Sequence, residues 1–191
     1  VASRGLGDVY KRQDLTREIF RTLVNTVKKP ISLKMRIGVT EENKSLFLDI
    51  AKIAEQEGIQ MITLHGRTVS QGYSGHADWD MIKKLKENSS VPIVGNGDIT
   101  SPEIAKQVLD YTGCDYIMIG RGAMGNPFIF EQINDYLECG EYKQYTLTDR
   151  LEAFVTYMEL TEKYNIRFAN IKQQAIRFTK GTVGGCLLYT S

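Results

Sequence analysis

The sequence lacks long apolar runs and carries almost no net charge. No apolar stretch approaches the roughly 20 residues of a membrane span, and the first residues lack the apolar core of a signal peptide. The 24 Lys and Arg residues nearly balance 23 Asp and Glu residues, for a net charge of +1. A nucleic-acid ligand would therefore need a local patch of positive charge, which the total does not show. We expect no membrane partner and no obligate protein partner.

Cysteine is scarce, and the three present show no paired or metal-type spacing. They are Cys114, Cys139 and Cys186. This usage suits a reducing compartment, so we expect a cytoplasmic protein. No acidic cluster has the spacing of a metal site, and no serine or cysteine nucleophile stands beside a base. The glycines form neither a dinucleotide fingerprint nor a P-loop.

The two ends of the chain differ from the rest. Residues 1–13, VASRGLGDVYKRQ, show no periodicity, and residues 186–191, CLLYTS, follow a Gly-Gly pair. Both resemble translated sequencing-adapter read-through at the edges of metagenomic gene fragments. We therefore expect non-native tails over 1–13 and 186–191, and a native segment of about 14–185 cut from a longer protein. Ordinary disordered termini are the alternative.

Between the ends, a strand pattern followed by a helix pattern occurs four times, at about 30 residues per unit. Ile31–Ile37 alternates apolar and polar residues, and three short apolar runs predict buried strands; these runs are Met61–Leu64, Pro92–Val94 and Tyr116–Ile119. Four such units predict a parallel sheet. They are half of an eight-stranded barrel or most of a doubly wound sheet, and periodicity leaves that choice open.

Helix signals flank these strands. The first helix is expected over Asp14–Lys28, with Asp14 as N-cap and apolar residues along one face; the face comprises Leu15, Ile19, Leu23 and Val27. Gly58 marks the end of the second helix. Asp78 is expected to cap the third helix and Ser101 the fourth, where Pro102 takes the first helical position.

From Phe128 onward the pattern is helical only. A helix is expected over residues 128–137, ended by Gly140, and a polar linker over 141–147. Further helices are expected from Thr148 and over 171–180 behind an Asn170 cap. We therefore expect one domain over 14–140 and the start of a helical domain over 141–185. This helical tail is locally basic, through Arg167, Lys172, Arg177 and Lys180. Charge alone favours an ordinary solvated helix face there.

Polar side chains lie in or directly after the ends of the four predicted strands. They are Lys34 and Arg36, His65 and Arg67, Asn96 and Asp98, and Arg121. The carboxyl ends of parallel strands meet at one edge of a sheet, where ligands bind. Two glycine turns, 95–98 and 120–122, permit close backbone approach at the same edge. This composition predicts a pocket for a phosphate-bearing, partly anionic ligand.

Five motifs in this order resemble tRNA-dihydrouridine synthases. They are KMRIG (34–38), LHGRT (64–68), YSGHADWD (73–80), VPIVGNGDI (91–99) and DYIMIGRGAMGNPFIF (115–130). The resemblance covers essentially all of 14–185. It implies an α/β fold: the second half of an FMN-binding TIM (β/α)8 barrel, followed by an α-helical domain. It also implies reduction of the C5=C6 bond of a uridine in tRNA, with NADPH recharging the flavin.

The resemblance assigns roles by residue. Lys34 would lie beside N1 and the C2 carbonyl of the flavin ring, where a cation stabilises reduced flavin, and His65 would also contact FMN. The phosphate would be held by Asn96, Gly97, Asp98, Gly120 and Arg121. Arg36 and Arg67 would face the flipped-out uridine and the RNA. The helical tail would grip the tRNA backbone through Lys172, Arg177 and Lys180.

The resemblance also indicates what this chain does not contain. The catalytic acid of the family is a cysteine in the first half of the barrel, and none of Cys114, Cys139 and Cys186 fits that position. We therefore expect no catalytic residue in this chain. A half-barrel also exposes sheet edges and apolar surface. The isolated 191-residue chain is expected to be poorly soluble and inactive.

Two other readings remain open from the sequence. One is another FMN-dependent TIM-barrel oxidoreductase that acts on a small molecule, such as a dihydroorotate or dihydropyrimidine dehydrogenase. The basic helical tail argues against it, because a small-molecule enzyme does not need one. The other is an RNA-binding module without catalysis, which the residues of the flavin pocket disfavour.

Overall fold

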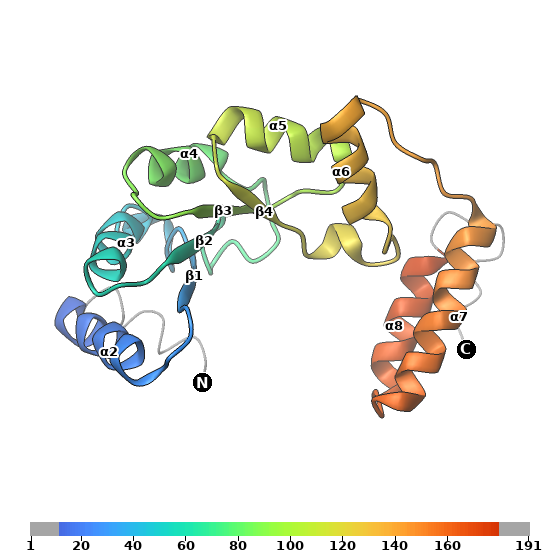
Figure 1. The fold of residues 1–191 in the computed structure, drawn as a ribbon, viewed down its shortest axis with the longest axis horizontal. Coiled ribbons are helices and arrows are strands. Elements are labelled where there is room, and N and C mark those ends of the chain that lie inside the picture. The colour runs from blue at the N-terminus through green and yellow to red at the C-terminus, as the bar shows by residue number, and fades with distance from the viewer. Residues whose placement is uncertain (1–11, 180–191) are drawn as a thin grey trace. The chain divides into compact units, whose positions relative to one another are not determined.

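The computed structural model describes residues 12–179, and the chain divides into two compact units. Unit 1 contains the chain up to Ile99 together with Ala105–Ile119, and unit 2 contains Thr100–Ile104 and the chain from Gly120 onward (Figure 1). Unit 2 thus begins ahead of the helical domain expected from residue 141, and that domain assignment stays a prediction. The expected tail 186–191 and most of 1–13 lie outside the described residues.

Unit 1 is built on a four-stranded, wholly parallel sheet in the order β1-β2-β3-β4. The strands are β1 (Ser32–Arg36), β2 (Met61–His65), β3 (Ile93–Asn96) and β4 (Tyr116–Met118). The strand order never reverses, and crossovers between parallel strands are right-handed. The connecting helices therefore lie on one face of the sheet. This winding is that of a barrel and not of a doubly wound sheet, which carries helices on both faces.

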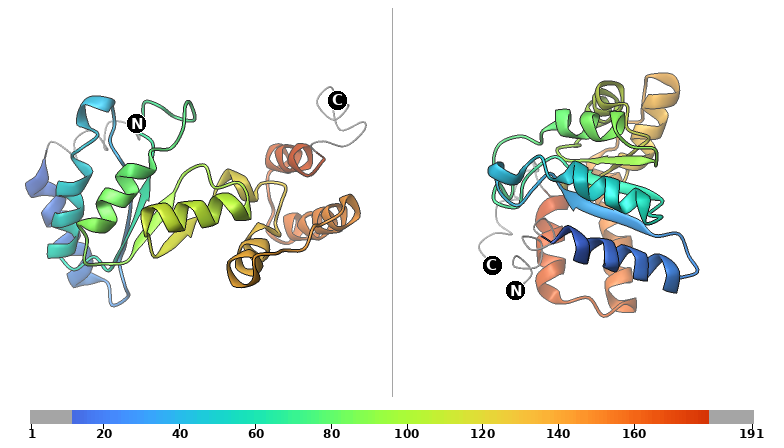
Figure 2. Two further views of the ribbon diagram at one scale, coloured as in Figure 1. Left: turned by 90° about the horizontal axis from the view of Figure 1, so that it is seen from above. Right: turned by 90° about the vertical axis from the view of Figure 1, so that its left-hand side faces the viewer.

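The helices of unit 1 alternate with its strands. They are α2 (Gln13–Thr26), the 3-10 turn η1 (Glu41–Asn43), α3 (Phe47–Gln56), α4 (Trp79–Glu87) and α5 (Pro102–Thr112), which begins in unit 2. In Figure 2 the helices α2, α3 and α4 follow one another in chain order along the sheet. The predicted boundaries at Gly58, which has φ 92°, and at Asp78 are confirmed. Ser101 accepts a hydrogen bond from the Ile104 N–H at 3.3 Å, as expected of a cap.

The core of unit 1 lies between the sheet and its helices. Its fully buried side chains come from both the strands and the helices; they include Ile62, Leu64, Ile93, Phe47, Ile82, Leu85 and Val108. Strand residues one position apart face opposite sides of a sheet. Met35 and Leu64 are paired in register and both buried, so their side faces the helices. The other face carries Lys34, Arg36 and His65.

The apolar face of α2 is exposed. Leu15, Ile19, Leu23 and Val27 are each 40–44% exposed, whereas Thr16 and Phe20 are buried. The helix is held to α3 by ion pairs from Arg17 and Arg21 to Glu57, at 2.7 and 2.9 Å. Asp14 lies inside the helix, because α2 begins at Gln13. Periodicity identifies an apolar face but does not show whether a partner covers it.

The strand β4 is less buried than expected. It spans Tyr116–Met118, and Ile119 lies outside it. Tyr116 is 60% exposed, and Ile117 and Met118 are half-buried. The reason is position: within the described residues β4 pairs with β3 alone, so it is an edge strand. An apolar run predicts a buried strand only when neighbours cover both of its sides.

Unit 2 is helical after a short 3-10 turn. Its elements are η2 (Arg121–Ala123), α6 (Ile129–Cys139), α7 (Leu147–Lys163) and α8 (Phe168–Phe178). Gly140 ends α6 in the left-handed conformation, as expected. Thr146 caps α7 by accepting from the Asp149 N–H at 3.2 Å, so α7 begins ahead of the expected Thr148. Asn170 lies inside α8, whose N-cap is Arg167, so the Asn170 cap was wrong.

The segment between α6 and α7 contains no helix or strand, yet aromatic contacts fix it to α6. The Tyr145 ring stacks on Phe128 with centroids 3.8 Å apart, and its hydroxyl donates to Glu131 at 2.7 Å. That hydrogen bond raises the pKa of Tyr145 to about 12. Gln132 Nε2 donates to the Lys143 carbonyl at 2.9 Å. The expected linker, residues 141–147, is therefore held against α6 by specific contacts.

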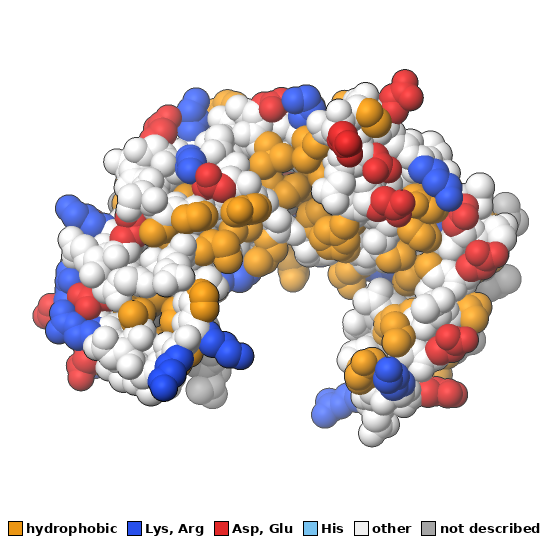
Figure 3. Space-filling view, viewed as in Figure 1, with side chains coloured by type: hydrophobic (Ala, Val, Ile, Leu, Met, Phe, Trp, Pro, Cys, Tyr) orange, Lys and Arg blue, Asp and Glu red, His pale blue; other side chains and the backbone are white. Residues whose placement is uncertain are grey.

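The helices α7 and α8 form a hairpin with apolar side chains on its surface (Figure 3). The exposed apolar residues of α7 are Leu147, Leu151, Val155, Met158 and Leu160. An apolar pocket of about 640 Å³ opens between α7, Phe178 of α8 and the Pro127-Phe128 pair. No helix within residues 12–179 is long and apolar enough to cross a membrane.

A close backbone contact joins α8 to the turn ahead of α6. Gly125 has φ 79°, and a Cβ built on it would lie 2.5 Å from the carbonyl oxygen of Arg177. Gly140 has the same φ of 79°, but a Cβ there would meet nothing within 4 Å. The two glycines therefore separate the backbone cost of substitution from its steric cost.

We expect Gly125→Ala to destabilise the protein more than Gly140→Ala does. The second change carries only the left-handed backbone cost of roughly 1–2 kcal/mol, and the first adds a clash worth about 1–3 kcal/mol more. Urea unfolding of the 191-residue chain, followed by far-UV circular dichroism at low micromolar concentration, measures both. Equal losses in the two variants would show that the contact with α8 is absent.

Candidate functional site

The parallel register aligns the carboxyl ends of three strands. Arg36 of β1 is paired with His65 of β2, and His65 is paired with Asn96 of β3. Paired residues on neighbouring parallel strands point to the same side of the sheet, and Lys34 shares that side because it lies two residues before Arg36. The register thus brings Lys34, Arg36, His65 and Asn96 together on the face opposite the helices.

His65 is half-buried and surrounded by positive charge. Burial of the ring, followed by the charges of Arg36, Lys34 and Arg67, lowers its pKa from 6.5 to about 4, against an opposing effect of Asp98. The ring is therefore neutral at neutral pH. Its Nδ1 accepts the Arg67 main-chain N–H at 3.2 Å. The proton of the neutral ring then resides on Nε2, which leaves His65 one N–H donor for a ligand.

The two cations of β1 reinforce this donor character. Partial burial, followed by the charge of Arg36, lowers the pKa of Lys34. Arg36 Nη1 donates to the Thr68 carbonyl at 2.8 Å, which ties β1 to the loop after β2. The face therefore presents an ammonium, a guanidinium and an imidazole N–H. Such a set suits a ligand that carries negative charge or several acceptor atoms.

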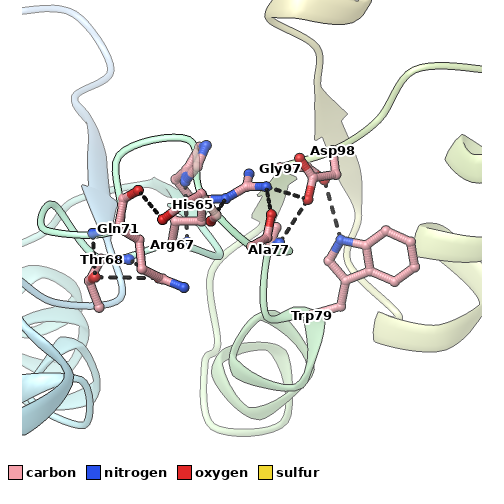
Figure 4. Close-up of polar contacts among 10 residues, drawn as sticks. His65, Arg67, Thr68, Gln71, Ala77, Trp79, Gly97 and Asp98 are labelled. Carbon is pink, nitrogen blue, oxygen red and sulfur yellow. Dashed lines mark hydrogen bonds and ion pairs between the residues drawn. The ribbon is translucent and has the colours of Figure 1, made fainter.

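Arg67 is buried, which differs from the position that we predicted from the sequence. We expected it to face the RNA, but the residue is 2% exposed. Its Nε donates to the Ser74 carbonyl at 3.2 Å, and Nη2 donates to the Gly75 carbonyl and to Asp98 Oδ2, both at 2.7 Å (Figure 4). The guanidinium is therefore used inside the protein.

The Asn96–Asp98 turn also uses its side chains internally. Asn96 Nδ2 donates to the Met118 carbonyl at 2.7 Å, which joins the ends of β3 and β4. Asp98 Oδ2 accepts the Ala77 N–H at 2.7 Å in addition to its bond from Arg67. Gly97 has φ 134°, and a Cβ there would lie 2.5 Å from the Ala77 Cβ. What this turn can offer to a phosphate is its main chain, and its phosphate role stays a prediction.

Sequence reasoning missed the residues that hold the loop after β2. The Thr68 N–H donates to Gln71 Oε1 at 2.8 Å, Trp79 Nε1 donates to the Gly97 carbonyl at 3.3 Å, and Lys44 pairs with Asp78 at 2.6 Å. The motif YSGHADWD carried part of the resemblance, but apart from the helix cap at Asp78 no role was assigned to its residues. Asp78 and Trp79 of this motif were the residues that could have indicated these contacts.

The remaining predicted residues lie in unit 2 or outside the described part of the chain. Gly120 and Arg121 are exposed, and a Cβ on Gly120 would meet nothing within 4 Å. On α8, Lys172 and Arg177 are exposed, and the Lys172 ammonium lies 5.5 Å from the Phe168 ring centre. Lys180 is not among the described residues. The assignment of these residues to phosphate and tRNA stays a prediction.

Of the three cysteines, Cys114 lies on the helix side of the sheet, opposite the cationic face. Cys114 is buried, and a Cβ on Gly95 would lie 3.0 Å from its Sγ, so it is a packing residue. Cys139 is exposed at the end of α6, and Cys186 lies outside the described residues. Residues 12–179 contain no group of three or more His, Cys, Asp or Glu side chains that could hold a metal ion.

The fold and this face define a class of protein. A singly wound parallel α/β sheet with cationic donors at its carboxyl edge is typical of a barrel protein that binds an anionic ligand. Comparison with known sequences names the family. The family model described as dihydrouridine synthase (Dus) matches residues 7–183, and the chain belongs to this family. The family is a TIM barrel, so unit 1 is part of a barrel and a helical region follows it.

Curated relatives agree with this family. The tRNA-dihydrouridine synthase B of Pasteurella multocida (strain Pm70) is 53% identical over 107 residues, which is 56% of this chain and 32% of that protein. The probable tRNA-dihydrouridine synthase of Rickettsia conorii is 43% identical over 157 residues, 82% of this chain and 47% of that protein. The chain therefore spans about a third to a half of the length of these relatives. The resemblance seen in the motifs is confirmed.

We expect the His65 ring to remain unprotonated well below pH 6.5. Diethyl pyrocarbonate acylates unprotonated imidazole, so the pH profile of its reaction reports the pKa. Between pH 7.5 and 5.5 the rate for N-acetylhistidine should fall about tenfold, whereas the rate at His65 should stay nearly constant once reagent hydrolysis is corrected. Peptide mass mapping separates His65 from His76, the other histidine of the chain. A midpoint above pH 6 at His65 would contradict the cationic environment.

The lowered pKa of His65 also determines how its contribution to the stability of the fold changes with pH. The pKa of His65 is lower in the folded protein than its ordinary value of 6.5. The unfolded chain therefore binds more protons between pH 6.5 and about 4, so this group makes the folded state less stable as the pH falls through that range.

Proposed function

We propose that this chain forms the flavin-holding and RNA-facing part of a tRNA-dihydrouridine synthase. The reaction is the reduction of a uridine C5=C6 bond in tRNA to dihydrouridine, with FMN as cofactor and NADPH as reductant. The observation that carries the proposal is the set of donors on one sheet face, Lys34, Arg36 and neutral His65. A tRNA substrate is consistent with a cytoplasmic protein.

The residues present fit an FMN molecule. The flavin ring carries several acceptor atoms along one edge, and the ribityl chain ends in a dianionic phosphate. Lys34 would donate to the ring edge, and the Nε2–H of His65 would donate to a second acceptor, because its Nδ1 is occupied by the Arg67 N–H at 3.2 Å. When bound, the flavin would supply the hydride. The cations of the chain would stabilise the negative charge of the reduced form.

The phosphate end would be held by main chain and by one arginine. In this proposal the contacts come from Asn96, Gly97 and Asp98, and from Gly120 and Arg121. Close approach of a phosphate requires uncrowded backbone, and apart from Gly120 and its chain neighbours no described residue has an atom within 4 Å of the Cβ position of Gly120. Arg121 would add a charge-assisted hydrogen bond.

The RNA would be held by separate cations. Arg36 lies on the same sheet face as Lys34 and would face the uridine, which must leave the base stack to be reduced. Lys172 and Arg177 are exposed on α8 and would contact the phosphate backbone, as would Lys180. The relatives named above are tRNA enzymes, and nothing in the comparisons favours a small-molecule dehydrogenase or an RNA-binding module without catalysis.

The proton donor of the reaction would come from outside this chain. Reduction of C5=C6 needs a proton at C5 as hydride arrives at C6. His65 is unsuited to supply it at neutral pH, because a ring with a pKa of about 4 is already deprotonated. Cys114 is buried and packed against Gly95. We therefore propose that the missing portion of the enzyme carries the acid, and that the chain alone does not complete the reaction.

A chimera tests the cofactor. In it, residues of this chain replace the aligned segment of the Rickettsia conorii relative, which supplies the rest of the enzyme. We expect the purified chimera to carry FMN and Lys34→Met to weaken flavin binding about ten- to a hundredfold, because a charge-assisted hydrogen bond is lost. Flavin fluorescence and absorbance measure this. The matched control is Lys86→Met, which removes an exposed ion pair with Asp115.

The same chimera tests the substrate. Incubated with NADPH and unmodified tRNA, it is expected to produce dihydrouridine, detected by nucleoside mass spectrometry. Arg36→Met should raise the KM for tRNA while the flavin stays bound, whereas Lys34→Met should lose flavin and activity together. A folded chimera that carries no flavin would refute the cofactor assignment. One that carries flavin but leaves tRNA unchanged would refute the substrate.

A further inference from the structure

We propose that Arg67 is a positioning residue that holds the β2–α4 loop, residues 66–78, against the Gly97-Asp98 turn. The arrangement presents His65 and the main chain of that turn in one fixed geometry. The nature of the ligand rests on the proposed function, but the coupling between loop and turn is a property of unit 1 alone. Figure 4 shows the contacts involved.

The Arg67 side chain connects two segments that lie far apart in the sequence. On the loop it donates to the main-chain oxygens of Ser74 and Gly75, at 3.2 and 2.7 Å. On the turn it forms an ion pair with Asp98 at 2.7 Å. The planar guanidinium reaches all three acceptors at once, which a single ammonium does not do. Removing it would release the loop from the turn.

Asp98 completes the connection from the other side. The same oxygen that receives Arg67 also accepts the Ala77 N–H at 2.7 Å, so the end of the loop is held as well as its middle. Asp98 has φ 57°, a conformation uncommon for a residue with a side chain. Such a backbone persists where its surroundings hold it, and the two bonds to its carboxylate provide that restraint.

The base of the loop is closed by main-chain bonds. The Gly66 N–H donates to the Asn96 carbonyl at 3.0 Å, and the Asp78 N–H donates to the Gly66 carbonyl at 2.6 Å. A Cβ on Gly66 would lie 2.8 Å from the Asp78 carbonyl oxygen. The start of the loop, its end and the end of β3 therefore converge at one point. Arg67 follows that point directly, and its own N–H sets the tautomer of His65 at 3.2 Å.

Stability alone does not account for a charged residue at this position. Arg67 is 2% exposed, and its Nη1 has no hydrogen-bond partner among the described residues. Burying a charged group with an unmatched donor is costly, and apolar residues of similar size often serve a core better. The geometry of the contacts is what an apolar residue would not reproduce. The role of Arg67 is therefore to position the loop and the turn, and not to fill space in the core.

Hydrogen exchange of the full 191-residue chain, free of ligand and at low micromolar concentration, tests the coupling. Arg67→Met and Asp98→Asn should each speed exchange in peptides covering residues 69–78 at least about tenfold. The control is Arg21→Met, which breaks an exposed ion pair with Glu57 and should leave the loop unchanged. Arg67→Lys should give an intermediate rate, because the charge is kept and the fork is lost.

The double variant Arg67→Met/Asp98→Asn makes the test specific. If the pair acts as one connection, loop exchange in the double variant should be no faster than in the faster single variant. Two results would overturn the proposal. One is loop exchange in the double variant that is faster by the product of the two single increases. The other is wild-type loop exchange in both folded single variants. If Arg67→Met speeds exchange across the whole chain, the loop exchange rate of Asp98→Asn decides the test, because this substitution keeps the shape of the side chain.

The chimera separates this inference from the proposed function. Arg67→Lys in the chimera is expected to reduce flavin affinity about tenfold or more while the overall fold is retained. If the unsubstituted chimera binds no flavin, the proposed function fails, and the exchange experiment still decides the role of Arg67. If flavin binding is normal and the loop exchanges at its wild-type rate in Arg67→Met and Asp98→Asn, the positioning role fails alone.

Discussion

The register of β1, β2 and β3 is the constraint on which the site depends. Parallel pairing puts Arg36, His65 and Asn96 side by side, and the two-residue period adds Lys34 to the same face. A slip of one residue in any strand would turn its site residue toward the helices and a core residue toward the ligand face. Burial of Met35 and Leu64 on the helix side opposes such a slip. The apolar core therefore fixes the position of the polar groups.

The density of positive charge on this face has consequences for each group. Desolvation and neighbouring cations keep His65 neutral, so it is a donor and not an acid. Arg67 is buried and paired with Asp98, and its charge also contributes to the lowered pKa of His65. The loop after β2 is thereby tied to the turn after β3. The loops beside the cationic face are thus arranged by an internal ion pair.

Local signals in the sequence predicted much of the fold. The four strands, the helix ends at Gly58 and Gly140 and the cap at Ser101 depend on short-range chemistry and were predicted. Burial was predicted less well: the strand β4 is partly exposed at the edge of the sheet, because burial depends on neighbours that periodicity does not reveal. For Arg67 the expectation of an RNA contact was wrong in placement, since nothing in HGRT indicates that the guanidinium turns inward to Asp98.

By itself the sequence determined the family, the strand-helix repeat and the set of polar residue types at the strand ends, because each is written in contiguous motifs. The tertiary structure alone decided the winding of the sheet, the tautomer and charge of His65, and the partner of Arg67. The physical reason is distance along the chain. Strand order, desolvation and the Arg67–Asp98 pair all join residues far apart in the sequence. Their energies arise only once the sheet has formed.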